Sequence, residues 1–211
     1  MATTISGTSG VTFPAGGVGN PAGAVVGTTD TQTLTNKTLG SGLVAGASYL
    51  TSGTAVTLTT QTNVDFTSIP SWAKRVTVML NAISLSSVTP DFYLQLGYGA
   101  TPTFENTNYI ANSAQINSAG STGFNGNITT AFLICRAMSL VADTISGVVV
   151  LTNVSGNIWT MMGNNSRNAS QAVTYAAGVK TISGGALSAV RVLHSGTTET
   201  FDAGSINILY E

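Results

Sequence analysis

The run Phe92-Tyr93-Leu94-Gln95-Leu96 alternates large apolar side chains with polar or amphipathic ones. Because successive side chains of an extended strand point to opposite faces, this period of two is typical of a strand with one buried face. Comparable strand-forming runs recur from about residue 50 to the end of the chain. They cover residues 56–60, 76–80, 131–137, 145–154, 158–162, 173–179, 190–194 and 205–210.

The segments between these runs are rich in Gly, Asn and Ser, as in residues 153–157. No segment has the apolar period of an amphipathic helix, whereas many short strands separated by turns predict an all-β fold. We expect residues 49–211 to form an antiparallel β-sandwich or jelly-roll-like domain. Its last strand is expected to follow a turn at residues 202–205 and to place Ile206 and Ile208 on one face.

Residues 1–48 differ in composition from the rest of the chain. Gly, Ala, Ser and Thr dominate, Phe13 is the only aromatic residue, and Asp30 and Lys37 are the only charged ones. Sparse apolar residues without helical period, interrupted by Gly and Pro, cannot build a core of their own. We therefore expect residues 1–48 to be an extended arm that binds other polypeptides.

Charged residues make up only 7% of the chain, and the net charge is −1. A typical soluble domain has about 25% charged residues, so the surface of this protein must be polar but nearly uncharged. Such a weak field does not attract nucleic acid or an anionic membrane. Soluble β-proteins commonly protect exposed sheet edges with charges, above all Lys, and this chain has only Lys37, Lys74 and Lys180. We expect its sheet edges to be covered by loops or by other subunits.

Two further features argue against membrane insertion and against a disulfide. The longest apolar runs, such as residues 147–151, are far shorter than the ~20 residues that cross a bilayer. The first residues also lack the basic and apolar regions of a secretory signal. Cys135 is the only cysteine, so no intrachain disulfide can form, and we expect a buried thiol.

The sequence offers little for catalysis or for a metal site. His194 is the only histidine, and alternation places it on the face of Val190 and Val192. We therefore expect a partly buried side chain rather than a general base acting on Ser195. The carboxylates show no spacing that pairs two of them for glycoside hydrolysis. Zinc and EF-hand ligand sets are missing, which leaves open only an ion held on a symmetry axis. We predict no enzymatic activity and no cofactor.

Four stretches of the chain resemble parts of bacteriophage fibre proteins. Residues 29–39, Thr-Asp-Thr-Gln-Thr-Leu-Thr-Asn-Lys-Thr-Leu, are similar to an element that recurs in tail-fibre and related appendage proteins of tailed phages. The C-terminal β-domain of many phage fibre-like proteins resembles the other three stretches, taken in order. These are residues 69–78 (Ile-Pro-Ser-Trp-Ala-Lys-Arg-Val-Thr-Val), 154–159 (Val-Ser-Gly-Asn-Ile-Trp) and 201–211 (Phe-Asp-Ala-Gly-Ser-Ile-Asn-Ile-Leu-Tyr-Glu).

The resemblance implies a structural virion protein of tail-fibre or head-fibre type that is a homotrimer without a cofactor and is assembled in the cytoplasm of a bacterial host. It also implies that the arm anchors the subunit to tail, neck or capsid proteins of the particle. Alternation in residues 31–36 suits a strand that is donated to a neighbour. The expected anchoring residues are Phe13, Asp30, Gln32, Leu34, Asn36 and Leu39.

Two segments combine aromatic or charged side chains with amides, a mixture that suits contact with host surface glycans. They are residues 98–124 and a loop expected at residues 163–168. A long solvated connection with two buried anchors is the preferred explanation of residues 98–124, and the same ambiguity applies to the loop. A host-glycan-binding lectin, a capsid decoration or cement protein and a polysaccharide depolymerase are the alternatives to a purely structural fibre subunit. The candidate receptor-contact residues are Tyr98, Phe104, Asn106, Asn108, Tyr109, Asn165 and Arg167.

Overall fold

The computed structural model describes residues 5–6, 10–11, 50–87, 90–136, 140 and 142–211. The chain divides into two units, Met1–Ala47 and Ser48–Glu211. In the first unit, β1 (Ile5–Ser6) pairs antiparallel with β2 (Gly10–Val11). The expected anchoring residues lie outside the described residues; they are Phe13, Asp30, Gln32, Leu34, Asn36 and Leu39.

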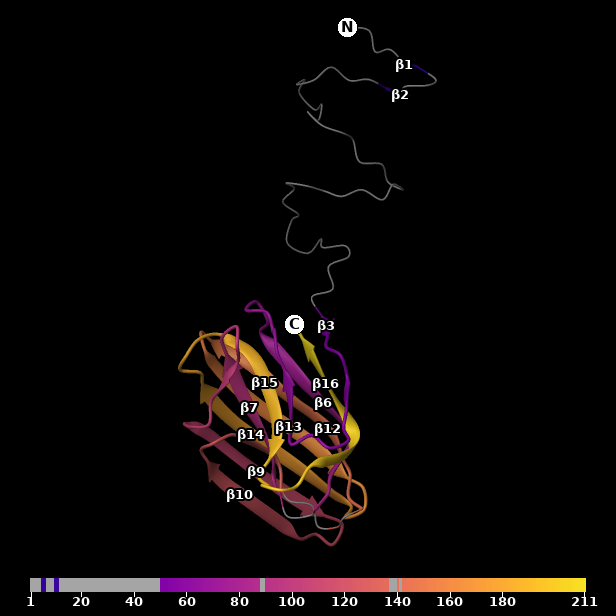
Figure 1. Ribbon diagram of the computed structural model, residues 1–211, viewed down its shortest axis with the longest axis vertical. Helices are drawn as coiled ribbons and strands as arrows, with labels where there is room; N and C mark the ends of the chain where they lie inside the picture. Colours follow the sequence, from indigo (N-terminus) through magenta and orange to yellow (C-terminus); the bar gives the residue numbers. More distant parts are fainter. Residues whose placement is uncertain (1–4, 7–9, 12–49, 88–89, 137–139, 141) are drawn as a thin grey trace. The chain divides into compact units, whose positions relative to one another are not determined.

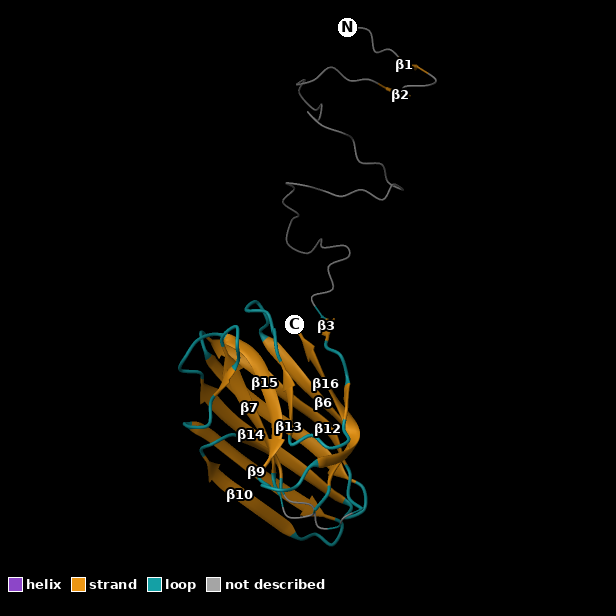
Figure 2. Cartoon of the chain, viewed as in Figure 1, coloured by secondary structure: helices purple, strands orange, loops and turns teal. Residues whose placement is uncertain are grey.

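The second unit is built from two antiparallel sheets (Figure 1), and its described residues include no helix (Figure 2). The all-β, sandwich-like fold expected from the period of two is therefore confirmed. The nine-stranded sheet has, in spatial order, β10 (Thr122–Ile128), β9 (Tyr109–Asn117), β14 (Ala172–Thr181), β13 (Ile158–Arg167), β12 (Ile145–Ser155), β6 (Arg75–Leu85), β16 (Phe201–Tyr210) and β3 (Thr51–Ser52), with β4 (Val56–Thr57) beside β16. The five-stranded sheet has β11 (Phe132–Cys135), β7 (Phe92–Tyr98), β15 (Leu187–His194) and β5 (Asn63–Phe66), with β8 (Thr103–Phe104) beside β7.

The two sheets share one hydrophobic core. On β7 the alternation of the sequence is kept, because Phe92, Leu94 and Leu96 are buried. Tyr93 and Gln95, which lie between them, are only half-buried. Inward residues of β6 and β15 belong to the same core, and Figure 1 shows β7 and β15 in front of the nine-stranded sheet. Two inner faces that interdigitate in this way bury the apolar residues of an antiparallel sandwich.

Several strands occupy segments where the sequence predicts connections. β9 and the start of β10 lie within residues 98–124, and β13 runs through most of the loop expected at residues 163–168. β13 pairs with β14 without interruption from Ile158 to Arg167. The two loop predictions are therefore wrong. The physical reason is that Asn, Ser and Gly, which disfavour strands locally, are held in the ladder by a neighbour on each side.

The last strand, β16, begins earlier than the sequence predicts. The turn expected at residues 202–205 is instead a bulged part of β16, where the register against β6 shifts on both sides of Ala203. Gly204 has a φ of +91° in this bulge, a conformation that Gly adopts without strain. Beyond the bulge, Ile206 and Ile208 are buried on one face, as predicted.

Replacing Gly204 with Ala should destabilise the domain strongly. A Cβ at this position would lie 2.4 Å from the carbonyl oxygen of Ala82 and 2.5 Å from that of Asn81. We expect the free energy of unfolding to fall by about 3 kcal/mol, as the sum of backbone strain and overpacking. Urea denaturation measures the change.

Gly156 provides the matched control for this prediction. It has a φ of +51°, but an added Cβ would have no neighbour within 4 Å. Gly156→Ala should therefore cost only the left-handed conformation, about 1 kcal/mol. Equal losses in the two variants would show that the contact with β6 is not what restricts Gly204.

Candidate interaction surface

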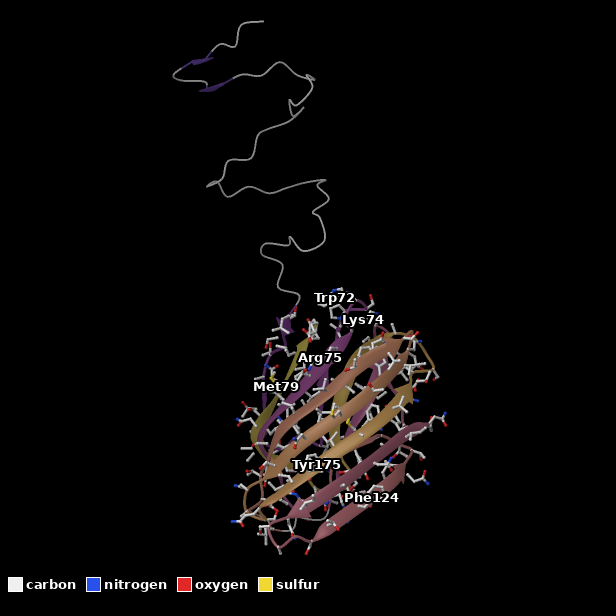
Figure 3. All side chains as sticks on the ribbon, turned by 180° about the vertical axis from the view of Figure 1, so that it is seen from behind. Trp72, Lys74, Arg75, Met79, Phe124 and Tyr175 are labelled. Atoms are coloured by element: carbon white, nitrogen blue, oxygen red, sulfur yellow. The ribbon has the colours of Figure 1, made fainter. Side chains whose placement is uncertain are left out.

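The side of the nine-stranded sheet that points away from the core carries many apolar side chains. On β13, Trp159 and Met161 are buried in the core, whereas Met162 is exposed. The same alternation in β9, β10, β12 and β14 gives a continuous surface, which we call the outer face of these five strands. Figure 3 looks onto this face and shows Tyr175 on β14 and Phe124 on the edge strand β10.

The strand registers determine which outward residues are neighbours. Across the sheet, Phe124 lies opposite Ala114. Ala114 in turn lies opposite Tyr175, and Tyr175 lies opposite Asn164. Residues opposite each other on antiparallel strands have their Cβ atoms about 5 Å apart, so their side chains are in reach of one another. The exposed aromatic rings of Phe124 and Tyr175 therefore flank a small residue.

Exposed hydrophobic side chains are concentrated in these five strands. They contain nine of the twelve large hydrophobic residues that are exposed in the described part of the chain. Phe124 is 70% exposed and Met162 is 69% exposed. Single exposed apolar residues are normal on a soluble protein, whereas a contiguous set marks a contact surface. The nine residues are Ile110, Ile116, Phe124, Val148, Val154, Ile158, Met162, Val173 and Tyr175.

The outer face carries no charged side chain. Arg167 and Lys180 are the only charged residues of the five strands, and both are buried. The Arg167 guanidinium lies 3.9 Å from the Asp143 carboxylate, and Lys180 forms an ion pair with Glu105. The polar residues on the outer face are therefore all neutral. The face lacks the charged side chains that normally keep an exposed sheet soluble.

A hollow of about 510 Å³ opens on the outer face between β10 and β13. Small residues, among them Ala114 and Ala177, lie between the larger Phe124, Tyr175 and Met162. Because a β-sheet places outward side chains on a regular grid, this alternation of large and small residues produces both projections and a depression on one surface.

A buried ion pair fixes the segment after β8 to the end of β14. Glu105 and Lys180 form this pair, and both side chains are almost completely buried. The other Glu105 carboxylate oxygen accepts hydrogen bonds from the backbone amide and the hydroxyl of Ser183, both at 2.6 Å. Lys180 also donates to the carbonyl oxygen of Thr107 at 2.8 Å. Burial by itself raises the pKa of Glu105, but Lys180 and Ser183 lower it by more, so the pKa lies below its usual value.

Glu105→Gln should destabilise the domain by about 3 kcal/mol, because it leaves the Lys180 ammonium buried without a counter-charge. The double variant Glu105→Gln/Lys180→Met should recover part of this loss, since it removes both charges. Because the folded-state pKa of Glu105 is lowered, its contribution is present above the ordinary carboxyl pKa of about 4.3 and is lost as the pH falls through the folded value. Urea denaturation between about pH 7 and about pH 3 measures this; an acid dependence identical in the parent and Glu105→Gln proteins would contradict it.

The structure removes three residues from the candidate receptor contacts. Tyr109, Asn165 and Arg167 are buried, so they cannot touch a receptor directly, and this part of the prediction is wrong. The Tyr109 hydroxyl accepts a hydrogen bond from the amide of Leu96 at 2.8 Å. The Asn165 side chain donates to the carbonyl oxygen of Ile134 at 2.9 Å. Inward alternation on β9 and β13 places these side chains between the two sheets.

The other candidate receptor residues lie away from the outer face. Tyr98 and Phe104 are half-buried on β7 and β8, and Asn106 and Asn108 are exposed in the segment that follows β8. The Arg191 guanidinium lies 4.0 Å from the centre of the Phe104 ring, so this ring already has a cation as partner. The four residues therefore do not join Phe124 and Tyr175 in one site.

The neighbours of His194 are not arranged as a catalytic triad. The His194 ring is buried and packs edge-to-face on Phe201, with 5.4 Å between the ring centres. Burial lowers the pKa of His194, against the opposing charge of Glu199. The Ser195 hydroxyl accepts a hydrogen bond from the amide of Asp91 at 2.9 Å rather than donating to His194. The expectation of a packed histidine is confirmed.

Three further features of the described residues concern the cysteine, metal binding and membrane-spanning helices. Cys135 is buried, as predicted, and burial raises the pKa of its thiol. The described part of the chain contains no group of three His, Cys, Asp or Glu residues placed to hold a metal ion. It also contains no helix of the length and hydropathy needed to cross a membrane.

Three stretches that the sequence analysis singled out lie together in the nine-stranded sheet. Residues 69–78 lead into β6, residues 154–159 form the turn between β12 and β13, and residues 201–211 contain β16. β6 lies between β12 and β16. The Lys74 amide donates to the carbonyl oxygen of Glu211 at 2.7 Å, which joins the first stretch to the last. Figure 3 labels Lys74 at this end of the sheet.

Comparison of the chain with protein-family models, curated proteins and solved structures found no match. Function must therefore be inferred from the residues of the chain itself. Phe124, Met162 and Tyr175 are the prominent residues of the outer face, and the sequence pattern did not single them out. One feature of the sequence could have pointed to this surface. Residues 158–167 and 172–181 have no charged residue at their outward positions, so the sequence gives neither strand a face that is clearly suited to solvent.

Proposed function

We propose that the protein is a structural, fibre-type subunit of a bacteriophage particle and that it works as a homotrimer. The observation that carries this proposal is the exposed, uncharged outer face of an all-β domain. Such a surface suits lasting contact with other polypeptides better than free movement in solvent. The stretches at residues 29–39 and 201–211, which resemble phage fibre proteins, support the same assignment.

In this proposal the two parts of the chain have different tasks. Residues 1–48 anchor the subunit to a tail, neck or capsid protein, and residues 49–211 project from the particle, where they stabilise it or contact the host surface. A capsid decoration or cement protein is the form of this function in which the arm binds the head. An averaged electron-microscopy map of the particle distinguishes a head position from a tail or neck position.

Deleting residues 1–45 should remove the subunit from phage particles, because it removes the proposed anchor. The β-domain should stay folded, since its core residues all belong to the second unit, Ser48–Glu211. Immunoblots of purified particles measure incorporation, and circular dichroism of the purified domain measures folding. The full-length chain, produced in the same way, is the control. Incorporation of the truncated chain at normal copy number would place the anchor elsewhere.

A second function, host-glycan binding, is favoured by the residues around the hollow of the outer face. Phe124 and Tyr175 offer exposed rings, and Asn112 and Asn164 offer amide donors and acceptors. A volume of about 510 Å³ also lies within the ~300–1,000 Å³ range of small-molecule pockets. In a lectin of this kind the hollow would hold a neutral sugar.

Glycan binding predicts saturable attachment of the purified protein to host cells or surface polysaccharide, and free sugar should compete with it. Tyr175→Ala should weaken such binding about tenfold, as expected for the loss of one ring contact. The control is Trp72→Ala, because Trp72 is about as exposed as Tyr175 but lies in the turn before β6 and does not line the hollow. Binding that does not saturate, or that both variants keep, would remove the lectin function.

A further inference from the structure

We infer that the outer face, formed by β9, β10, β12, β13 and β14, is the surface on which copies of this chain pack against one another. The inference rests on the proposed function and deepens it, because it names the partner of that surface as a second copy of the same chain. Three properties of the outer face identify a second copy as its partner: its area, its lack of charge, and its relief, meaning its pattern of projecting side chains and hollows.

The area of the outer face matches what a stable interface needs. Five strands about 4.8 Å apart, each with about four outward residues spaced by about 6.7 Å, cover roughly 650 Å² as a flat rectangle. A biological interface requires about 1,000 Å² in total, or about 500 Å² from each partner. The face is therefore large enough to hold two copies together, and sheets that pack face to face are a common arrangement in β-proteins.

The lack of charge selects a partner that is itself uncharged. A charged surface repels a copy of itself, whereas a neutral one does not. The outer face has no charge with which to attract a basic or acidic partner, because Arg167 and Lys180 are buried. Among the described residues, the outer face of another copy is a surface of the same neutral and apolar character.

The relief of the face suits contact with a copy of itself. Phe124 and Met162 project from it, and the hollow beside them is lined by small residues such as Ala114 and Ala177. Projections of one copy can therefore enter the depression of the next. A sugar fits this hollow less well, because its exposed lining offers few hydrogen-bonding side chains beyond the amides of Asn112 and Asn164 and the hydroxyl of Tyr175.

The edge strand extends the same surface. β10 ends the sheet and, among the described strands, pairs only with β9. Its residues Thr122–Ile128 include no charged side chain and no Pro, two of the devices that usually keep an edge from pairing with another chain. The irregular register against β9 lies at one end of the strand, between Asn125 and Ile128. Contact with a sister copy over the outer face would cover Phe124 together with this edge.

The test is the oligomeric state of the full-length chain in solution, measured by light scattering at micromolar concentration. The parent chain of 21.4 kDa should form an oligomer rather than a monomer. A threefold mass agrees with the proposed trimer, whereas a twofold mass, expected when two copies pack face to face, supports the inference but contradicts the trimer. Met162→Lys should raise the dissociation constant roughly 100-fold or more, because it buries an uncompensated charge in the interface. The exposed Met162 side chain has room for this change in the free subunit, which circular dichroism verifies.

Leu140→Lys is the matched control, since Leu140 is a large hydrophobic residue that is 47% exposed but lies outside the five strands of the outer face. It should assemble like the parent chain. Phe124→Asn is a second, milder variant that should also weaken assembly. A monomeric parent chain, or a Met162→Lys variant that assembles as the parent does, would overturn the inference. The inference would also fail if Met162→Lys left the oligomer intact while deletion of residues 1–45 abolished it. The proposed function fails separately, if particles do not contain the subunit.

Discussion

A sheet that is apolar on both of its faces cannot leave either face in water without cost, and this constraint governs the whole domain. One face of the nine-stranded sheet is buried by the five-stranded sheet in a shared core. On the other face, the five strands β9, β10, β12, β13 and β14 expose Phe124, Met162 and Tyr175 and carry no exposed charged residue. The sandwich therefore buries one face of the sheet within a single chain, and the packing of copies proposed above would bury the other.

The few charges of the domain do not compensate for this exposed surface. Among the described residues many charged side chains are used in pairs with one another, so they hold segments together rather than hydrate the outer face. Two of these pairs are buried, where removing one partner costs more than the pair contributes. The pairs are Asp65 with Arg191, Arg75 with Glu211, Glu105 with Lys180 and Asp143 with Arg167.

The sequence predicts the class of the fold well, because alternation is a local property of each strand. The buried set Phe92, Leu94 and Leu96 follows directly from it. β9 and the second half of β13 could not be found in this way, since their strand state depends on pairing with β14. The arm cannot be compared, since its expected anchoring residues lie outside the described part of the chain.

The candidate surface was less predictable than the fold. Aromatic and amide residues drew attention to Tyr109 and Asn165, which alternation turns inward once β9 and β13 are strands. The residues that do face outward, such as Met162, become a patch only when the registers bring five strands together. The composition did indicate that part of the surface would be uncharged, because a chain with 7% charged residues has too few charges to cover a large exposed sheet.

The side-by-side residues Met161 and Met162 allow the most direct test. Met161 is 3% exposed and Met162 is 69% exposed in the single subunit. Of these two residues, peroxide should therefore oxidise only Met162 when the outer face is open to solvent. If copies pack through this face, mass spectrometry of the assembled full-length protein should find Met162 protected nearly as well as Met161. Rapid oxidation of Met162 in the native assembly, at the rate of an unhindered methionine, would contradict the account.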